Sequence, residues 1–452
     1  MEPVLAVAKD TFSIDKQAIV FVNSKRSAES VAEKISKISE KELKDEPKAI
    51  LKALSSPTRQ CKRLSKIVSK GVAFHHSGLN YKQRQIIEDS FREGKINIIC
   101  ATPTLAAGLD MPAFRVIIRD LKRYTGFGMS YIPVLEFQQM IGRAGRPSFD
   151  TKGEAIVLVS SDKEKEFVIS NFINGEPENI YSKLAVEPVL RTYVLSLICT
   201  GFVSSFDELL GFMKKTFYAH QYGDLQKLEF ILRGVVNKLF EWNFLNDDFS
   251  ATLLGNRVSE LYLDPYTANF LIENIEEDFE DFGLIHLICS THEMRPLINA
   301  RKKDEELTHG RLSKDDLIYF DGDLNTVKTA LVLDYWMSEY SEDFLYENLG
   351  VTPGELNSKV DSCDWLLYAL VELCRIKGFK ISGRLARLRV RVKNGVREEL
   401  LPLLRFKGIG RVRARKLFNN KIKDVGDVKR AQLSDLKLLL GEKTALSLKE
   451  QV

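Results

Sequence analysis

Residues 96–112 read INIICATPTLAAGLDMP. A short apolar run is followed by two threonines, a glycine and an aspartate, which is typical of the carboxyl end of a buried β-strand. Four further β-rich runs alternate with helical patterns in the first 160 residues: AIVFVN (18–23), VAFHHS (72–77), RVIIRD (115–120) and EAIVLVS (154–160). This alternation predicts a parallel α/β sheet. The helical pattern before residue 96 ends on Gly94, a typical helix stop.

Beyond residue 176 the pattern becomes helical. We expect a winged helix over 176–264, with a short β-wing at 249–263. A mostly helical bundle over 265–393 and a small helical unit over 394–452 follow. The sequence therefore predicts four domains, an α/β domain over 1–175 and three mostly helical ones.

The charge of the chain is concentrated near its carboxyl end. The net charge is only +4, but residues 375–430 hold 19 Lys or Arg against 4 Asp or Glu. Such a surplus predicts a polyanionic partner, with nucleic acid favoured over a membrane surface. The longest apolar runs are far shorter than a membrane span, and the amino terminus does not resemble a secretion signal. Six cysteines without a CxxC pair indicate a reducing compartment and no structural zinc.

Two arginines stand three residues apart in QQMIGRAGRPSFD (138–150). Placed one helical turn apart, the guanidinium groups of Arg143 and Arg146 can meet the charge on a transferring γ-phosphate. Gly142 and Gly145 would let the backbone approach a nucleotide closely. The alternative is a surface helix start with two solvated arginines.

Hydroxyl and carboxylate groups follow the strand in residues 96–112. Thr102 and Thr104 offer hydroxyls, and Asp110 offers a carboxylate. In open α/β sheets the carboxyl ends of the strands are where ligands bind. The sequence therefore predicts a site at this edge.

Four blocks, FVNSKRSAE, FHHSGL, ATPTLAAGLDMP and QQMIGRAGRP, resemble in order and spacing motifs IV, V and VI of the superfamily 2 helicases. The resemblance implies a RecA-like domain in which Gln139, Arg143 and Arg146 are catalytic, both arginines acting as fingers. It implies ATP contacts for Gly108, Asp110 and Gly142. It also implies DNA contacts for Thr102 and Thr104.

The chain contains no phosphate-binding loop of the form GxxxxGK[ST], because Gly94-Lys95 is followed by Ile96 and lacks the earlier glycine. A DExH sequence at a strand end is also missing. Helicases of this type carry both parts in a first RecA-like domain. The resemblance therefore implies a chain that starts at the second such domain. ATP and Mg²⁺ would bind in the complete protein, and this chain alone would not hydrolyse ATP.

Residues 119–136, RDLKRYTGFGMSYIPVLE, predict a β-hairpin around a Gly-Phe-Gly turn. We place Tyr124, Phe127 and Tyr131 near its tip, where aromatic rings can stack on the last base pair of a duplex. An ordinary surface hairpin packed on its neighbour is the alternative.

Residues 403–428, LLRFKGIGRVRARKLFNNKIKDVGDV, resemble a helix-hairpin-helix element. The turn at Gly408 and Gly410 would present backbone N–H groups to a DNA phosphate at a helix amino terminus. The surrounding charge would come from four side chains: Arg411, Arg413, Arg415 and Lys416. The alternative is a tight turn with a basic face.

Taken together, these parts resemble the archaeal Hjm-type helicases, which are related to HELQ and to the helicase domain of polymerase theta. The family unwinds DNA 3′ to 5′ at stalled forks, so the resemblance implies a DNA partner and a cytoplasmic, nucleoid-associated protein, or a nuclear one in a eukaryote. We expect a monomer without membrane attachment.

In that family, a tryptophan on a long helix of the bundle stacks on a base of the single strand. Trp365 matches that position, although a core position in an amphipathic helix is the alternative. Ser358 stands where the family often has an arginine, with Lys359 beside it as a candidate DNA contact.

Two other functions remain open from the sequence. One is a nucleic-acid binding or annealing module that does not hydrolyse ATP. The other is a Ski2-like RNA helicase.

Overall fold

The computed structural model describes residues 2–54, 56–106, 111–125, 128–146, 150–184, 186–312 and 323–452, without the side chains of Leu225 and Leu312. These residues fold as two compact units. Unit 1 contains residues 1–179 and 342–357, and unit 2 contains residues 180–341 and 358–452. The four-domain division expected from the sequence is finer than these two units and stays a prediction.

A five-stranded parallel sheet with the order β2-β3-β1-β4-β7 forms the centre of unit 1. Its strands are β1 (Ala18–Phe21), β2 (Val72–His75), β3 (Ile98–Ala101), β4 (Arg115–Ile118) and β7 (Glu154–Val157). Each of the five predicted strands is present. All residues of β1 to β4 are buried, as expected of parallel strands covered on both faces.

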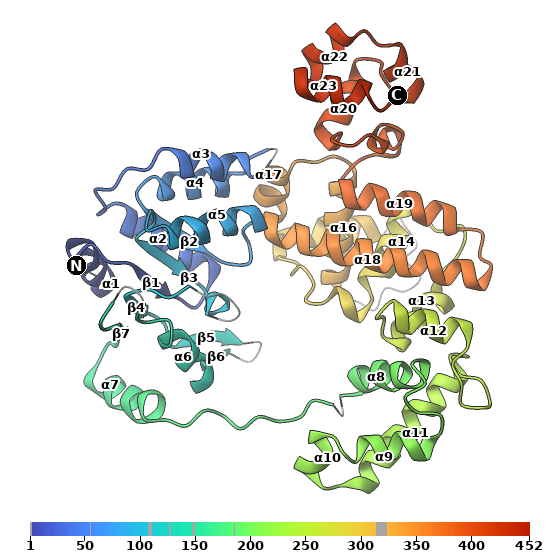
Figure 1. Cartoon of the computed structure of the whole chain (residues 1–452), viewed down its shortest axis with the longest axis horizontal. Helices are drawn as coiled ribbons and strands as arrows, with labels where there is room; N and C mark the ends of the chain where they lie inside the picture. Colours follow the sequence, from blue (N-terminus) through green and yellow to red (C-terminus); the bar gives the residue numbers. More distant parts are fainter. Residues whose placement is uncertain are drawn as a thin grey trace. The chain divides into compact units, whose positions relative to one another are not determined.

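Helices cover this sheet and share its hydrophobic core, with α2, α4 and α5 packing on β2 and α6 on β4 (Figure 1). The helices are α1 (Pro3–Ser13), α2 (Lys25–Ser36), α3 (Asp45–Lys52), α4 (Arg59–Val68), α5 (Tyr81–Arg92), α6 (Val134–Ile141) and α7 (Asp162–Val168), with short turns η1 (Pro103–Leu105) and η2 (Ile169–Ile173). Helix α5 ends before Gly94, whose φ of +74° suits glycine.

A two-stranded hairpin of β5 (Lys122–Thr125) and β6 (Gly128–Tyr131) follows β4, as predicted. Its register pairs Thr125 with Gly128 beside the turn and Lys122 with Tyr131 at the open end. The expectation that Tyr131 lies near the tip was therefore wrong. Because Tyr131 pairs with Lys122, the first residue of β5, it is at the base of the hairpin.

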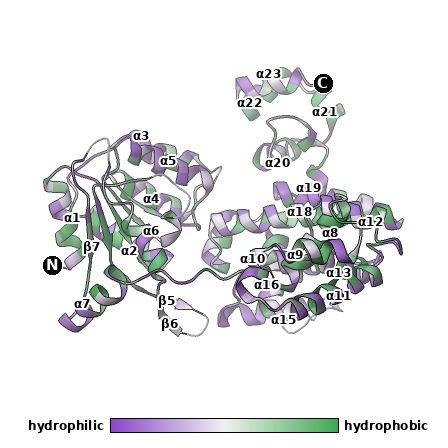
Figure 2. Cartoon of the chain, turned by 60° about the horizontal axis from the view of Figure 1, so that its bottom comes forward, coloured by the Kyte–Doolittle hydropathy of each residue, from purple (hydrophilic) through white to green (hydrophobic). Residues whose placement is uncertain are grey.

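Unit 2 is helical, and its helices carry hydrophobic and hydrophilic segments side by side, as amphipathic helices with a shared core do (Figure 2). Its first part contains α8 (Glu187–Cys199), α9 (Phe206–Met213), α10 (Phe217–Tyr222), α11 (Leu225–Glu241), α12 (Leu253–Glu260) and α13 (Pro265–Asn274). The β-wing expected at 249–263 is not what the structure shows there, because most of this stretch forms the helix α12. The Thr252 side chain caps that helix, and the β pairing recorded there is the single bridge between Leu245 and Ala251.

The rest of unit 2 contains α14 (Asp281–Cys289), η3 (His292–Met294), η4 (Lys302–Asp304), α15 (Glu305–Leu312), α16 (Leu324–Met337), α19 (Ser382–Asn394) and most of α18 (Pro353–Lys377). Residues from Val396 to Leu448 form a hydrophobic cluster of their own. Its elements are η6 (Glu398–Leu400), η7 (Leu403–Arg405), α20 (Arg411–Asn419), α21 (Val425–Arg430), α22 (Leu433–Leu440) and α23 (Glu442–Lys449). Among the described residues, no helix combines the length and apolar character needed to cross a bilayer.

Candidate nucleotide and nucleic-acid sites

The loop after β3 and the residues after α6 meet in unit 1. The Arg143 guanidinium donates to the Ala106 carbonyl oxygen, with Nη2 at 2.6 Å and Nε at 3.2 Å. Ala113 and Ala144 form a parallel bridge beside this contact. The structure thus brings together the two predicted motifs that flank the hairpin.

The two arginines do not lie one turn apart on a helix, which corrects the sequence interpretation. Helix α6 ends at Ile141, and Gly142 caps it as an exposed residue. Arg143 and Arg146 therefore belong to the loop that follows. Gly145 has a φ of +96°, and a side chain at Gly153 would come within 2.4 Å of the Gly145 nitrogen. Gly145 and Gly153 therefore allow two backbone segments of the protein to approach each other closely, whereas the sequence pattern predicts a close approach of Gly145 to a nucleotide.

Arg146 is held by a carboxylate that the sequence interpretation missed. Its Nε lies 2.6 Å from Asp150 Oδ2, and its Nη1 donates to Gln17 Oε1 at 2.7 Å. Lys16 Nζ lies 2.8 Å from the other oxygen of Asp150. Asp150 stands four residues after Arg146 inside the quoted stretch, and this i, i+4 spacing of opposite charges was the available signal.

The Arg146 side chain remains partly exposed, at 20%, whereas the Asp150 side chain is 1% exposed. Hydrogen bonds from Arg146, followed by those from Lys16, lower the pKa of Asp150 to about 2. In this structure the guanidinium that was predicted to meet a phosphate is therefore paired with an ionised carboxylate of its own unit.

This pairing should make the stability of unit 1 depend on pH. The folded-state pKa of Asp150 lies below the ordinary value of about 3.9, so the stabilisation is nearly complete above about pH 5 and most of it is lost as the pH falls to 2. We expect Asp150→Asn to lower the unfolding free energy at pH 7 and to lose most of this difference near pH 2. Urea unfolding at both pH values measures it, and an equal difference at both would contradict the assignment.

Apart from the two tyrosines of the hairpin, the remaining candidate site residues of unit 1 are Gln139, the two threonines after β3, and three residues that the structure does not describe. Gln139 is exposed on α6. Thr102 and Thr104 lie just after the carboxyl end of β3, their hydroxyl oxygens 3.0 Å apart. Gly108, Asp110 and Phe127 lie outside the described residues. In the described part of the chain, His, Cys, Asp and Glu side chains do not gather into a group of three that would hold a metal ion.

The two described aromatic residues of the hairpin differ in exposure. Tyr124 is 74% exposed and is available to stack on a ligand. The Tyr131 ring packs against Phe167 at 4.7 Å between centroids and lies under the Lys122 ammonium. Tyr124 fits the stacking role, whereas Tyr131 supports the base of the hairpin.

Trp365 and Lys359 lie on α18. The Trp365 ring is half-buried, and its Nε1–H donates to the Leu261 carbonyl oxygen at 3.1 Å. The Lys359 side chain is buried, and its Nζ lies 2.6 Å from the Met294 carbonyl oxygen. A buried ammonium bonded to the backbone does not face a nucleic-acid strand, so Lys359 is corrected to an interior residue. The exposed position is Ser358.

The predicted turn before α20 is present. Gly408 has a φ of +85°, Gly410 caps α20, and a side chain at either glycine would meet open space. Arg413 and Lys416 are exposed on α20, and Arg413 Nη1 donates to the Gly408 carbonyl oxygen at 2.7 Å. This end of the helix is therefore accessible to a ligand.

Arg411 and Arg415 of α20 contact residues of unit 2 outside the helix and its preceding turn. Arg411 stacks over the Trp336 ring and donates to the Tyr340 carbonyl oxygen at 2.6 Å. Arg415 pairs with Glu339 and Glu399, and these carboxylates raise its pKa. Burial favours the neutral form of Glu339, but the bonds from Arg415 and the Arg397 N–H outweigh it and hold the pKa of Glu339 below its usual value. These two arginines therefore fasten the C-terminal cluster to the end of α16.

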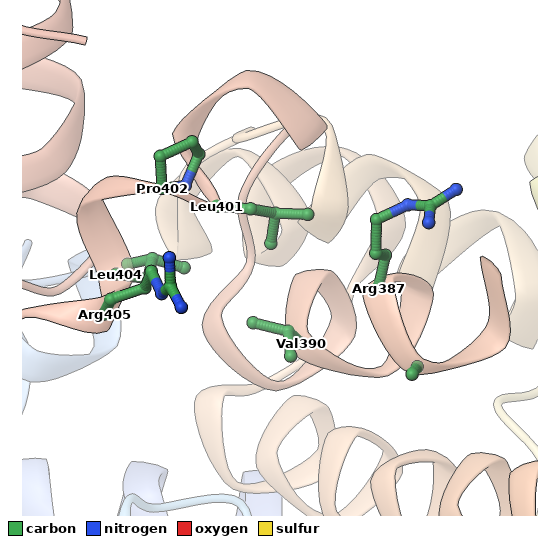
Figure 3. A pocket seen from close by; sticks show the side chains of 7 residues that line it. Arg387, Val390, Leu401, Pro402, Leu404 and Arg405 are labelled. Carbon is green, nitrogen blue, oxygen red and sulfur yellow. The ribbon is translucent and has the colours of Figure 1, made fainter. Parts of the chain in front are cut away.

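Part of the basic charge near the carboxyl end is neutralised by ion pairs with carboxylates that are distant in the sequence. On α19, Arg384 and Arg391 pair with Asp281, and Arg389 pairs with Asp364. An apolar groove of about 570 Å³ lies between α19 and η7, and its lining includes Val390, Leu401 and Leu404. Arg387 and Arg405 lie on either side of Val390 there (Figure 3).

Three families of known domains match the chain. They are "Helicase conserved C-terminal domain" over residues 5–148, "Helix-turn-helix domain" over residues 153–246 and "Archaeal helicase, domain 4" over residues 282–395. The first contains strands β1 to β4 of the sheet and both arginines, and the last contains α16, α18 and α19.

The chain is similar to several archaeal proteins named ATP-dependent DNA helicase Hel308. It is 40% identical to that of Pyrococcus horikoshii over 448 residues, which cover 94% of this chain and 62% of the relative. It is 37% identical to that of Methanocella arvoryzae, covering 100% of this chain and 65% of the relative, and 36% identical to that of Pyrobaculum calidifontis, covering 99% and 66%. The chain thus spans 62% to 66% of the length of these relatives. In sequence and in the order of its three matched domains, the chain is thus similar to the archaeal ATP-dependent DNA helicases named Hel308.

Proposed function

We propose that this chain carries the arginine half of an ATP site and the DNA-binding domains of an ATP-dependent DNA helicase. The Arg143–Ala106 contact carries the proposal, because it joins the arginine loop to the loop that holds Thr102 and Thr104. Hydroxyls for a nucleic-acid backbone and guanidinium groups for a nucleotide are thereby linked in one unit. Nucleotide binding at the arginines would then alter nucleic-acid binding at the threonines, and the reverse.

The other half of the ATP site would come from a first RecA-like domain. ATP and Mg²⁺ would bind to that domain, and this chain alone would not hydrolyse ATP. In the closed motor, Arg143 and Arg146 would leave Ala106 and Asp150 and stabilise the negative charge of the transferring γ-phosphate. After hydrolysis the arginines would return to these partners, which keeps the open state well defined.

The DNA path would run over several surfaces. Thr102 and Thr104 would contact the strand backbone, Tyr124 would stack at the junction with the duplex, and Trp365 would stack on a base of the single strand. Arg413, Lys416 and the turn at Gly408 and Gly410 would contact phosphates. We propose 3′ to 5′ unwinding of forked DNA in replication-linked repair by a monomer of the Hjm subtype, acting on the chromosome of an archaeon.

The exposed cations of α20 give a test on this chain by itself. We expect Arg413→Ala and Lys416→Ala each to weaken binding to a forked DNA and to lower the slope of log K against log salt by about 1. Fluorescence anisotropy at several salt concentrations measures the slope. Arg92→Ala on α5, which removes an exposed pair with Asp89, is the matched control and should leave the slope unchanged.

The same titrations test the preference for DNA over RNA. Equal or tighter binding of a matched RNA fork would contradict the preference for DNA and favour a Ski2-like RNA helicase. An unchanged slope in both α20 variants would remove α20 from the binding surface.

A further inference from the structure

The segment of residues 342–357 belongs to unit 1, although the 162 residues before it belong to unit 2. It contains α17 (Glu342–Phe344), η5 (Leu345–Leu349) and the first turn of α18. Helix α18 then continues to Lys377 within unit 2 and carries Trp365. One helix therefore has its base in the RecA-like unit and the rest of its length in the other.

Polar contacts hold this segment to the rest of unit 1, and its apolar side chains are buried. Leu345, Leu349 and Val351 are buried. The backbone N–H of Arg59, at the start of α4, donates to Asp343 Oδ1 at 2.7 Å. Lys25 Nζ, at the start of α2, lies 2.7 Å from Glu355 Oε1. The segment is thus fastened to two separate helices.

Gly354 makes a backbone contact that leaves no room for a side chain. Its N–H donates to the Gly78 carbonyl oxygen at 3.0 Å, in the turn that follows β2. A Cβ at this position would lie 2.1 Å from the Ser77 carbonyl oxygen and 2.7 Å from that of Leu79. Those atoms are backbone, which cannot yield as the end of a flexible side chain can. The base of α18 therefore sits against the turn only because residue 354 has no side chain.

The turn itself is fixed from the interior. The Gly78 N–H donates to His76 Nδ1 at 3.1 Å, so Nδ1 is the acceptor and the ring proton is on Nε2. His76 Nε2 lies 3.3 Å from Glu29 Oε1, and the His76 side chain is fully buried. The surface that receives Gly354 is thus set by side chains of the RecA-like core.

We propose that residues 342–357 are a coupling anchor, through which movement of the RecA-like unit is transmitted to α18. An α-helix of 25 residues is stiff and about 37 Å long, so displacing its first turn displaces its far end. Gly354, Gly78, Lys25 and Glu355 are positioning residues: they keep the helix base in register with the unit that moves. The inference rests on the proposed helicase function.

The test uses the complete motor, in which this chain is joined to a phosphate-binding RecA-like domain. We expect Gly354→Ala to lower the number of base pairs opened per ATP hydrolysed by about threefold or more, while DNA affinity and DNA-stimulated ATP hydrolysis stay within about twofold. A purely structural contact would lower hydrolysis and unwinding together. Gly211→Ala on α9 is the matched control, because a Cβ there meets open space, and it should keep the normal ratio.

A second set of variants tests the anchor without crowding the turn. Glu355→Lys places two cations together and should lower the same ratio. Adding Lys25→Glu restores a pair of opposite charges and should recover it. Failure of the double variant to recover the ratio would count against the anchor.

The outcomes separate the anchor from the function on which it rests. Unwinding per ATP that is unchanged in Gly354→Ala and Glu355→Lys, in a motor that hydrolyses ATP and unwinds DNA, would overturn the anchor alone. A motor without substitutions that shows no DNA-stimulated ATP hydrolysis would overturn the proposed function and the anchor with it.

Discussion

Replacing Arg146 by lysine in the complete motor is expected to lower DNA-stimulated ATP hydrolysis by about 10³-fold. Lysine keeps a positive charge beside Asp150 but lacks the planar fork that contacts two oxygens of a phosphate at once. The fold should persist, because Lys16 also pairs with Asp150. Steady-state hydrolysis with saturating single-stranded DNA measures the effect, and circular dichroism verifies the fold.

Arg92→Lys, in an exposed pair with Asp89, is the control for a change of arginine to lysine in the same unit. It should leave hydrolysis unchanged. ATP hydrolysis by Arg146→Lys within about threefold of the unsubstituted motor would show that Arg146 serves only to hold Asp150.

Replacing Arg191 by methionine should cause the largest loss of stability, about 3–5 kcal/mol in the unfolding free energy of unit 2. Arg191 on α8 makes two hydrogen bonds to Asp264, at 3.0 and 2.7 Å, and both side chains are less than a tenth exposed. Asp264 also caps α13 by accepting from the Tyr266 N–H. Without Arg191, the Asp264 carboxylate would remain buried beside the first turn of α13 without its strongest partner.

Urea unfolding of the chain, followed by tryptophan fluorescence, measures this loss. Arg233→Met on α11 removes an exposed pair with Glu229 and should cost less than about 1 kcal/mol. The double variant Arg191→Met, Asp264→Asn should recover part of the loss, because no charge is then buried unpaired. A loss in Arg191→Met no greater than in Arg233→Met would contradict the assignment.

The local patterns of the sequence predicted the sheet because its strands are short apolar runs, of which β1 to β4 are buried on both faces. Residues 18–21, 72–75, 98–101, 115–118 and 154–157 are all strands that the hydrophobic pattern indicated. The hairpin was predicted from the glycines between its two strands, which are also a local feature of the sequence. Local chemistry decided these elements, so a local reading was sufficient.

The partners of the charged residues could not be predicted in this way. Arg384 and Arg391 lie more than 100 residues from Asp281, and Lys359 bonds a carbonyl oxygen 65 residues away. The sequence alone overestimated how much of the basic charge is free and placed Lys359 on the surface. Asp150 was close enough to be found, since it follows Arg146 by four residues.

The stretch predicted as a wing shows a second limit. FSATLLGNRVSELYL contains alternating apolar residues, but Thr252 caps a helix at its centre, and Leu254 and Val258 face the core four residues apart. The helical spacing therefore prevailed over the β pattern. In so short a segment, a helix-capping residue predicts the structure better than alternating apolar residues do.

The central claim is that Arg143 and Arg146 serve an ATP site completed by another domain. The most direct measurement is a structure of the complete motor bound to forked DNA and a transition-state analogue of ATP hydrolysis. The account predicts that both guanidinium groups lie within hydrogen-bond distance of the γ-phosphate position, with the Arg146–Asp150 and Arg143–Ala106 bonds broken. Both arginines still bonded to Asp150 and Ala106 in that closed state would contradict it.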